Sequence, residues 1–374
     1  MQQENEPHTQ MASNEERYRQ AAEAAAPPLP KALRPIVILG AGGIVRAAHL
    51  PAYAKAGFPV IAIADSATGK AAELASEKNI PHAFDSIAEA VRFAPADAIF
   101  DIAVPATQIM TILPQLPSGA AVLIQKPMGE TLEEAILIRD HCRQRGLVAA
   151  VNFQLRYSPN NLAAVALHRA GLLGELHDME VQVRTYTPWK LWTFLATAPR
   201  LEILYHSIHY LDLIRSWLGN PLGLYAKTVR NPQTANLAAT KSTILLDYGE
   251  WKRVFVVTNH GHDFSSETHR SFVQWEGTGG AIRMDMGVNL DYPKGVPDTL
   301  AYAERNAPGA QWKNLPVKGN WFPDAFVGSM GALQSYVEGS TSDLPIGFES
   351  AYETMALVEA AYRSSARPAE PLPL

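Results

Sequence analysis

The chain has 374 residues and a formal net charge of -5 at pH 7; 47% of its residues are hydrophobic and 18% are charged. A chain of this length exceeds what one compact core usually holds, so two domains are expected. The slightly negative charge and the scattered Lys and Arg residues argue against nucleic acid and anionic membranes as partners. Cys142 is the only cysteine, which excludes a disulfide framework and a thiolate metal cluster. Because the sequence shows neither a secretory signal nor a membrane-spanning run, we expect a cytoplasmic protein.

Residues 1–34 are predicted to form a flexible N-terminal extension. The stretch "MQQENEPHTQMASNEERYRQ" is polar and charged, and "AAEAAAPPLP" ends in a proline cluster that is typical of an extended linker. A short helix is expected within this extension, from Asn14 to Ala25. No function is assigned to it from the sequence.

Short β-rich runs alternate with helical segments from residue 35 to residue 155. Strands are expected at 35–39, 59–65, 97–105, 120–127 and 147–153, and helices at 44–56, 68–79, 85–93, 107–116 and 131–146. The first run, "PIVIL", is apolar throughout, as is usual for a strand buried on both faces. This alternation predicts an α/β domain with a doubly wound parallel sheet, the Rossmann architecture.

A glycine cluster, "GAGGIV", connects the first strand to the first helix. Gly40 allows the tight turn, and Gly42 removes a side chain that would block a pyrophosphate. The helix that follows offers its free N–H groups to an anion. Val45 stands where the third glycine of the dinucleotide fingerprint would fall, so a plain structural corner is the alternative.

Asp65 ends the second strand about 20 residues beyond the glycines, where a ribose-binding acid usually lies. Its carboxylate would accept hydrogen bonds from both ribose hydroxyls and repel a 2′-phosphate, which favours NAD over NADP. Lys70 stands alone and farther along the chain, so we give it little weight against this preference.

The segments "GAGGIVRAAHLPAY", "IAIAD", "AVPATQIM", "VLIQKPMGETLEEA" and "VNFQLRYSP" occur in this order. Together they make the chain, from Pro35 to the C-terminus, resemble the Gfo/Idh/MocA oxidoreductases. The resemblance implies an N-terminal Rossmann domain at 35–155. It also implies an α+β C-terminal domain at 156–374 with a large open, mostly antiparallel sheet. The substrate would then lie between this sheet and the nicotinamide of the cofactor.

The cofactor NAD and its contacts also follow from this resemblance. The residues expected to bind NAD are Gly40, Gly42, Gly43, Ile44, Asp65, Val104, Pro105, Gln125 and Lys126. Where the family has Glu-Lys-Pro, this chain reads Gln125-Lys126-Pro127, which keeps the lysine and replaces the acid by an amide. A lysine at this strand end can hydrogen-bond the reacting oxygen. The alternative is a surface lysine before a turn-forming proline.

A second family signature, Asp-x-Gly-x-His-x-x-Asp, corresponds to "YHSIHYLD" on a predicted amphipathic helix. His209 and Asp212 match it, whereas Tyr205 replaces the first Asp. A near-neutral imidazole suits a general base, so His209 is expected to be catalytic, with Tyr205 as a relay and Asp212 near the substrate. The alternatives are a buried structural histidine, or a metal site with His206; no third metal ligand apart from Asp212 is apparent, so no metal is expected.

After Gly174, several runs alternate with period two, which predicts an antiparallel sheet with one solvated face. Aromatic, amide and imidazole side chains gather in this half, as suits a polyhydroxylated ring. The residues singled out are Trp189, Lys190, Trp192, Asn259, His260, His262, Trp321 and Asp324, and of these Trp189, Trp192 and Trp321, together with Arg156, His206 and Asp212, are expected to bind substrate. Arg156 has an alternative role as a tie between the two domains, and about half of the aromatics are expected to be structural.

The sequence therefore predicts an NAD-dependent dehydrogenase that acts on a hydroxyl or carbonyl group of a sugar, cyclitol or sugar acid. One alternative is a glycosidase or lyase that oxidises its substrate transiently and retains NAD. Another is a non-catalytic protein that senses NAD and a sugar. A homodimer or homotetramer is expected by analogy with the family.

Overall fold

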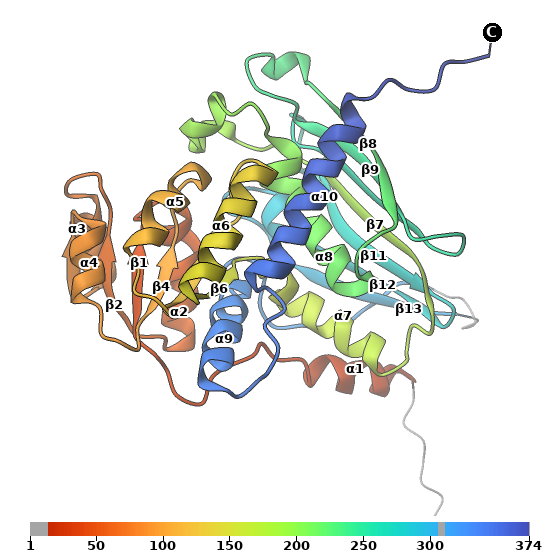
Figure 1. The fold of residues 1–374 in the computed structure, drawn as a ribbon. Coiled ribbons are helices and arrows are strands. Elements are labelled where there is room, and N and C mark those ends of the chain that lie inside the picture. The colour runs from red at the N-terminus through yellow and green to blue at the C-terminus, as the bar shows by residue number, and fades with distance from the viewer. Residues whose placement is uncertain (1–13, 306–310, 374) are drawn as a thin grey trace, which may run out of the picture.

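The computed structural model describes residues 14–305 and 311–373, which form two layered regions side by side (Figure 1). The first region holds a parallel sheet with the strand order β3-β2-β1-β4-β5-β6. Its strands are β1 (Ile36–Leu39), β2 (Val60–Ala64), β3 (His82–Phe84), β4 (Ile99–Ile102), β5 (Ala121–Ile124) and β6 (Val148–Val151). This order confirms the predicted Rossmann domain. The structure adds β3, whose three residues are too few to give a clear period.

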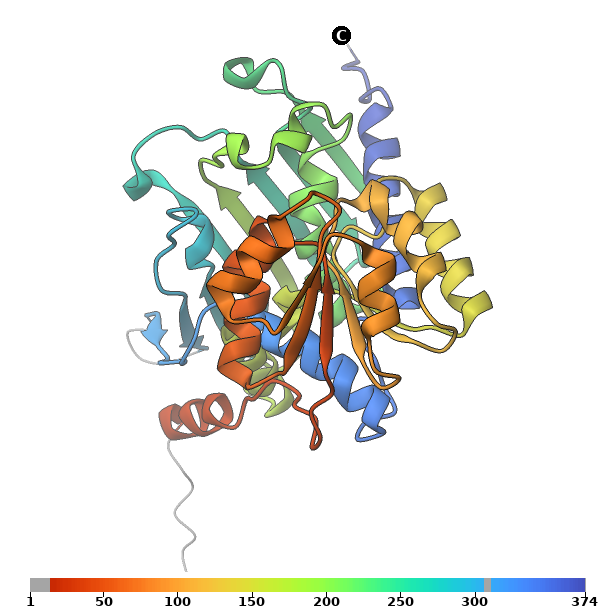
Figure 2. The ribbon, with the colours of Figure 1, turned by 90° about the vertical axis from the view of Figure 1, so that its left-hand side faces the viewer.

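Helices cover both faces of this sheet, as Figure 2 shows. They are α2 (Leu50–Ala56), α3 (Lys70–Lys78), α4 (Ile87–Phe93), α5 (Ile109–Ile112) and α6 (Leu132–Arg145). Local sequence fixes the ends of α6. The Thr131 side chain accepts a hydrogen bond from the Glu134 N–H, and Gly146 ends the helix in a left-handed conformation. Because helices lie on both sides, all four residues of β1 are buried.

The second region is built on an eight-stranded sheet with the order β14-β13-β12-β11-β7-β10-β9-β8. Its strands are β7 (Leu176–Arg184), β8 (Gly223–Val229), β9 (Lys241–Asp247), β10 (Arg253–Asn259), β11 (Arg270–Gly277), β12 (Gly280–Asp285), β13 (Thr299–Glu304) and β14 (Lys313–Asn314). The neighbours β7 and β10 run parallel, and the other neighbouring strands of this sheet pair antiparallel. The predicted large, mostly antiparallel sheet is confirmed.

One face of the large sheet is covered and the other is open. In Figure 1 the helices α7 (Pro159–Arg169), α8 (Ile208–Leu218) and α10 (Phe348–Ala366) lie on the side toward the first region. Along β9, Ile244 and Leu246 are buried, whereas Leu245 between them is exposed. This alternation is what a sheet packed on one face requires.

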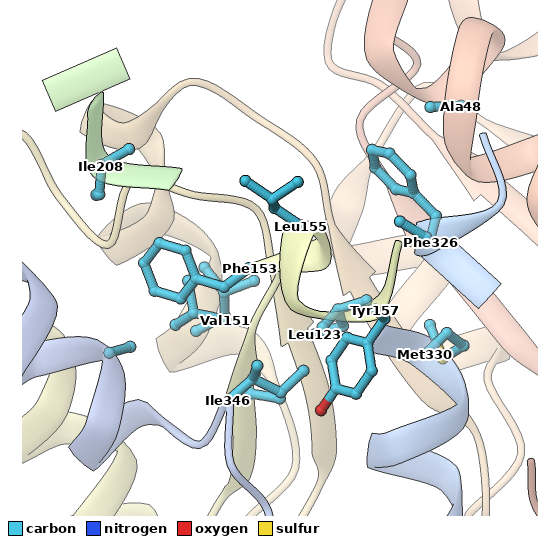
Figure 3. Packing of buried hydrophobic residues seen from close by; sticks show 14 of the residues in the cluster. Ala48, Leu123, Val151, Phe153, Leu155, Tyr157, Ile208, Phe326, Met330 and Ile346 are labelled. Atoms are coloured by element: carbon cyan, nitrogen blue, oxygen red, sulfur yellow. The ribbon is translucent and has the colours of Figure 1, made fainter. Parts of the chain in front are cut away.

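The C-terminal part of the chain returns to the first region. Helix α9 (Ala325–Glu338) packs against β5, β6 and α2, and Phe326 on it contacts the His49 ring at 4.9 Å between centroids. Farther on, the Val151 N–H donates to the Ile346 carbonyl over 2.8 Å. Figure 3 shows the apolar side chains at this junction, with Val151 beside Ile346 and Phe326 near Ala48. The strands of the two sheets fall on either side of residue 155, whereas α9, from the C-terminal part of the chain, packs on the first region.

Residues 14–34 do not behave as a free extension. Helix α1 (Asn14–Glu23) packs on α7, and its Tyr18, only 2% exposed, stacks on Tyr302 with ring centroids 3.8 Å apart. Farther along, the Arg34 N–H donates to the Gln334 side-chain oxygen over 3.0 Å. The expectation of flexibility is wrong for this part because buried aromatic contact offsets the chain entropy that its composition would favour. The rest of the expected extension, residues 1–13, lies outside the described residues.

Candidate active site

A cleft of about 780 Å³ lies between the two regions. The carboxyl ends of β1, β2, β4 and β5 form one wall, where a doubly wound sheet binds its ligands. Segments of the second region, around residues 185–195, 205–210 and 288–292, form much of the other. Of the residues expected from the sequence, the cleft is lined by Gly40, Gly42, Gly43, Ile44, Asp65, Val104, Pro105, Gln125, Lys126, Trp192, Tyr205, His206, His209 and Trp321.

The glycine turn leaves room for a ligand. Gly40 has a φ of +120°, and a Cβ atom there would stand 2.4 Å from the Ala103 carbonyl oxygen, so only glycine fits. A Cβ atom on Gly42 or Gly43 would meet nothing within 4 Å, although both residues line the cleft. This open space beside free backbone N–H groups fits the pyrophosphate of a dinucleotide.

Asp65 is fixed at the end of β2 by three donors. Its carboxylate accepts hydrogen bonds from the Ala41 N–H over 2.8 Å and from the Ala67 N–H over 2.9 Å. The Lys70 ammonium contacts it over 3.0 Å. Burial by itself would raise the pKa of Asp65, but these donors lower it below its usual value. Lys70, to which the sequence gave little weight, is thus a direct partner of the acid and also lines the cleft.

Lys126, two residues beyond the end of β5, lines the cleft. Its ammonium donates one hydrogen bond, to the main-chain oxygen of Tyr205 over 2.8 Å, which leaves two of its three N–H donors for a ligand. Burial lowers the pKa of Lys126 to about 8, because a low-dielectric surrounding disfavours the charged form. Such a lysine is cationic at neutral pH yet close to losing its proton.

His209, in the first turn of α8, faces the same cleft. It is 7% exposed, and Trp321 packs edge-on against its ring at 5.4 Å between centroids. Burial, and then the charge of Lys126, lower the pKa of His209 well below its usual range, so the ring is neutral at pH 7. Its Nδ1 has no hydrogen-bond partner among the described residues. The Asp212 carboxylate, one turn farther along the helix, pairs with Arg156 instead of this ring.

Three ionisable side chains next to His209 form a cluster that the sequence did not reveal. His206 lines the cleft and contacts the His260 ring at 4.2 Å between centroids. The His260 Nε2 atom is 3.6 Å from the buried Glu202 carboxylate, which also accepts a hydrogen bond from Ser207. Trp189, which does not line the cleft, packs edge-on against the rings of His206 and His260. Glu202 and His206 are only four residues apart, but His260 comes from a distant segment of the chain, so no spacing signal could have joined the three.

Tyr205 departs from the expected relay. Its hydroxyl donates to the Glu130 carboxylate over 2.5 Å, and Glu130 belongs to the first region. Burial and this hydrogen bond both raise the pKa of Tyr205. Residues 203–207 form a turn of π-helix, which widens the helix just before α8. The phenol thus joins the two regions at the wall of the cleft, and its single proton is engaged with Glu130.

Arg156 and Asp212 lie outside the cleft lining. The guanidinium makes a two-pronged ion pair with the carboxylate, over 2.5 and 2.6 Å, and also donates to the Pro345 carbonyl. Asp212 is only 1% exposed. Arg156 and Asp212 were expected to contact the substrate, but they form a buried ion pair with each other, because a buried carboxylate needs a close counter-charge. Also outside the lining are Trp189, Lys190, Asn259, His260, His262 and Asp324.

The cleft also contains residues that the sequence analysis did not single out. They include Gln154, Thr185, Thr187, Phe194, Tyr210, Asn289, Tyr292 and Phe322. These residues come from separate segments of the chain, which meet at the cleft only because the two domains pack together. Across residues 14–305 and 311–373, no group of three or more His, Cys, Asp or Glu side chains is arranged to hold a metal ion. In the same part of the chain, every helix is too short or too polar to cross a membrane.

Comparisons with known proteins agree with this geometry. Residues 34–153 match the Gfo/Idh/MocA family, described as an oxidoreductase family with an NAD-binding Rossmann fold. This match confirms both the resemblance and NAD as the cofactor of the first domain. The uncharacterized protein y4oX of Sinorhizobium fredii is 23% identical over 243 residues, which cover 62% of this chain and 66% of that protein.

Solved structures share the fold over nearly the whole chain. An oxidoreductase from Agrobacterium radiobacter, in complex with NAD+, L-tartaric acid and magnesium, has a TM-score of 0.76 at 20% identity, covering 90% of this chain and 97% of that one. An NAD binding oxidoreductase from Klebsiella pneumoniae has a TM-score of 0.73 at 17% identity, with coverages of 89% and 96%. UDP-N-acetylglucosamine 3-dehydrogenase from Acidithiobacillus ferrooxidans has a TM-score of 0.69 at 17% identity, with coverages of 89% and 98%. Residues 34–153 therefore match the NAD-binding domain of the Gfo/Idh/MocA oxidoreductases, and nearly the whole chain shares the two-domain fold of these solved oxidoreductases.

Proposed function

We propose that the protein is an NAD-dependent dehydrogenase that interconverts a hydroxyl and a carbonyl group on a sugar, cyclitol or sugar acid. The observation that carries this proposal is the position of Lys126 and His209. They come from different domains and line one cleft with the glycine turn and Asp65. A cationic donor and a neutral imidazole at the reacting end are the two groups that alcohol oxidation needs.

The chain's own residues handle the proton and the charge of the reaction. When bound, NAD+ supplies the acceptor for the hydride that leaves the carbinol carbon. Lys126 donates a hydrogen bond to the substrate oxygen and stabilises the negative charge that develops on it. The neutral His209 ring accepts the hydroxyl proton. Trp321 packs edge-on against that ring and so restricts its orientation.

We propose NAD over NADP as the preferred cofactor, because the Asp65 carboxylate sits where the ribose hydroxyls would bind. Lys70 reduces this preference without removing it, because its ammonium group already forms an ion pair with the Asp65 carboxylate. The Agrobacterium structure contains NAD+ and a hydroxy acid, and the Acidithiobacillus enzyme is named for a sugar nucleotide; both agree with the proposed substrate range.

The deciding experiment mixes the protein with NAD+ and a panel of sugars, cyclitols and aldonic acids while nicotinamide absorbance is followed. A dehydrogenase accumulates free NADH in proportion to the product. A glycosidase or lyase that retains its cofactor would change the substrate without net NADH, and a sensor would bind both ligands and change neither. Absence of NAD binding would contradict the proposal at its first step.

We further propose that the protein acts in the cytoplasm as a homodimer or homotetramer. The open face of the large sheet supports an assembly, because apolar side chains stand out from it: Tyr225 on β8 is 70% exposed and Leu245 on β9 is 43% exposed. Analytical ultracentrifugation of the protein and of its Tyr225→Asp variant tests this; a monomer in both samples would contradict the proposal.

A further inference from the structure

A chain of buried polar side chains runs through the first domain to the cleft. Asp101 on β4 and His49 before α2 are both fully buried, and His49 Nδ1 lies 2.7 Å from an Asp101 oxygen. The Tyr53 hydroxyl donates to the same oxygen over 2.8 Å. On the other side of the imidazole, Asn152 Nδ2 lies 3.5 Å from His49 Nε2 and donates to Gln125 Oε1 over 3.0 Å. The chain thus ends at Gln125, which lines the cleft.

The direction of each hydrogen bond in this chain follows from the one before it. A carboxylate can only accept, so the His49 proton is on Nδ1 and the Nε2 lone pair faces Asn152. The Asn152 NH2 group then donates twice, to His49 and to Gln125 Oε1. The Gln125 oxygen is therefore engaged inside the protein. Among the described residues its Nε2 has no hydrogen-bond partner, and it is the end of the amide left to face the cleft.

The reacting end of the cleft carries donors and lacks a free carboxylate. Asp65 is the only acid among the described residues that line the cleft, and it pairs with Lys70 at the nucleotide end. Two further acids lie behind the wall. Glu130 is bound by the Tyr205 hydroxyl, and Glu202 lies beside His260. A substrate carboxylate placed near Lys126 would therefore meet attraction and no opposing negative charge.

Building on the proposed function, we propose that the substrate is a hydroxy acid, with a carboxylate beside the reacting hydroxyl, and that Gln125 is a specificity-determining residue. Its fixed NH2 group donates to a carboxylate oxygen, while Lys126 binds the reacting oxygen next to it. Neutral polyols of the same length lose this contact and bind more weakly. The amide at position 125 thereby selects sugar acids over sugars and cyclitols.

The test compares L-tartrate with L-threitol, which has the same four-carbon skeleton and configuration but CH2OH groups in place of the carboxylates. Their affinities are measured by calorimetry on protein saturated with NADH. We expect L-tartrate to bind at least about tenfold more tightly, as suits one charge-assisted hydrogen bond plus the Lys126 charge. Gln125→Glu keeps the size and the bond from Asn152 but turns the donor into a negative charge. It should abolish the preference while L-threitol affinity stays within about threefold.

Equal affinity for the two probes, or a preference unchanged in Gln125→Glu, would overturn the proposal. Asn152→Asp supplies an independent arm. An acceptor at 152 draws the Gln125 NH2 inward and turns its oxygen to the cleft, so the preference should fall although Gln125 is intact. Should this variant not fold, as its melting curve would show, Gln125→Glu alone decides. Because the readout is binding, a dehydrogenase that prefers neutral polyols refutes only this inference, and a tartrate-binding protein that transfers no hydride refutes only the proposed function.

Discussion

The two halves of the cleft are built in different ways. The nucleotide half uses backbone groups and side chains that lie next to one another along the chain. Asp65 is held by Ala67 and Lys70, within five residues, and by Ala41 on the adjoining strand end. The substrate half uses side chains from segments more than 100 residues apart. His209, for example, meets Trp321 across it. The first half is a local motif; the second exists only because two domains meet.

This difference makes the two halves respond differently to substitution. A change in the nucleotide half is expected to alter which cofactor binds, because the charged side chains of Asp65 and Lys70 line this part of the cleft. A change in the substrate half is expected to alter turnover, because the proposed mechanism assigns the proton and the developing charge to single side chains. The variants below separate these effects, beginning with the largest.

His209→Asn should have the largest effect. Asn roughly preserves the size and hydrogen bonding of the ring but cannot accept the proton, so oxidation should fall by roughly two to four orders of magnitude. Steady-state turnover measures this, and calorimetry should show nearly unchanged NAD affinity. His206→Asn is the matched control three residues away, and a smaller loss is expected for it. A larger loss in His206→Asn would transfer the role of base to His206.

Lys126→Met should lower turnover by roughly 10²–10³-fold, the effect of losing one donor to a developing oxyanion. Cofactor affinity should change far less, because the ammonium acts at the reacting oxygen. Stopped-flow measurement of the hydride step gives the comparison. A variant that remains active would show that another group polarises the substrate.

The pH profile should reflect both groups. The pKa of His209 is lowered, so its ring is already neutral at pH 7 and any acidic limb lies below neutrality. Lys126 must be charged to stabilise the oxyanion, so kcat/KM for oxidation should fall as the pH rises through about 8. In Lys126→Met this basic limb should disappear. A rate that instead rises through pH 8 would identify the neutral lysine as the base.

Asp65→Ala should change the cofactor preference and leave the chemistry intact. Loss of the carboxylate removes the ribose contacts and frees Lys70 for a 2′-phosphate, so the NAD-to-NADP preference should fall by about tenfold or more, which corresponds to one charged hydrogen bond. Binding titrations with both cofactors measure this. Better binding of NADP than of NAD to the unmodified protein would contradict the assignment.

Tyr205→Phe should have the smallest effect. The phenol proton is directed to Glu130, so its removal should change turnover by less than about tenfold while it frees a carboxylate at the domain junction. Turnover and the melting temperature are measured together. Abolished turnover in a well-folded variant would return the phenol to the proton path.

Much of this protein could be predicted from sequence because its signals are local. The alternation of apolar strands and helices gave the Rossmann domain. The glycines with Asp65 gave the nucleotide half, since a strand end and the following turn are fixed by neighbouring residues. The order of the motifs predicted that His209 and Lys126 belong to the site, and both line the cleft. Predictions failed where a side chain chose between distant partners. Arg156 and Asp212 were expected at the substrate and instead pair with each other, and residues 14–34 pack where a free tail was expected.

The sequence by itself determined most of the elements and the glycine turn, and it pointed to the residues proposed to carry the reaction. The tertiary structure decided which of them share the cleft. It placed His206 against His260 and directed the Tyr205 hydroxyl to Glu130. It also oriented the Gln125 amide through a chain of hydrogen bonds that includes Asn152, His49 and Asp101. The physical reason is that charges and hydrogen bonds depend on distances of a few ångströms. Those distances between remote segments are fixed only when the two domains pack together.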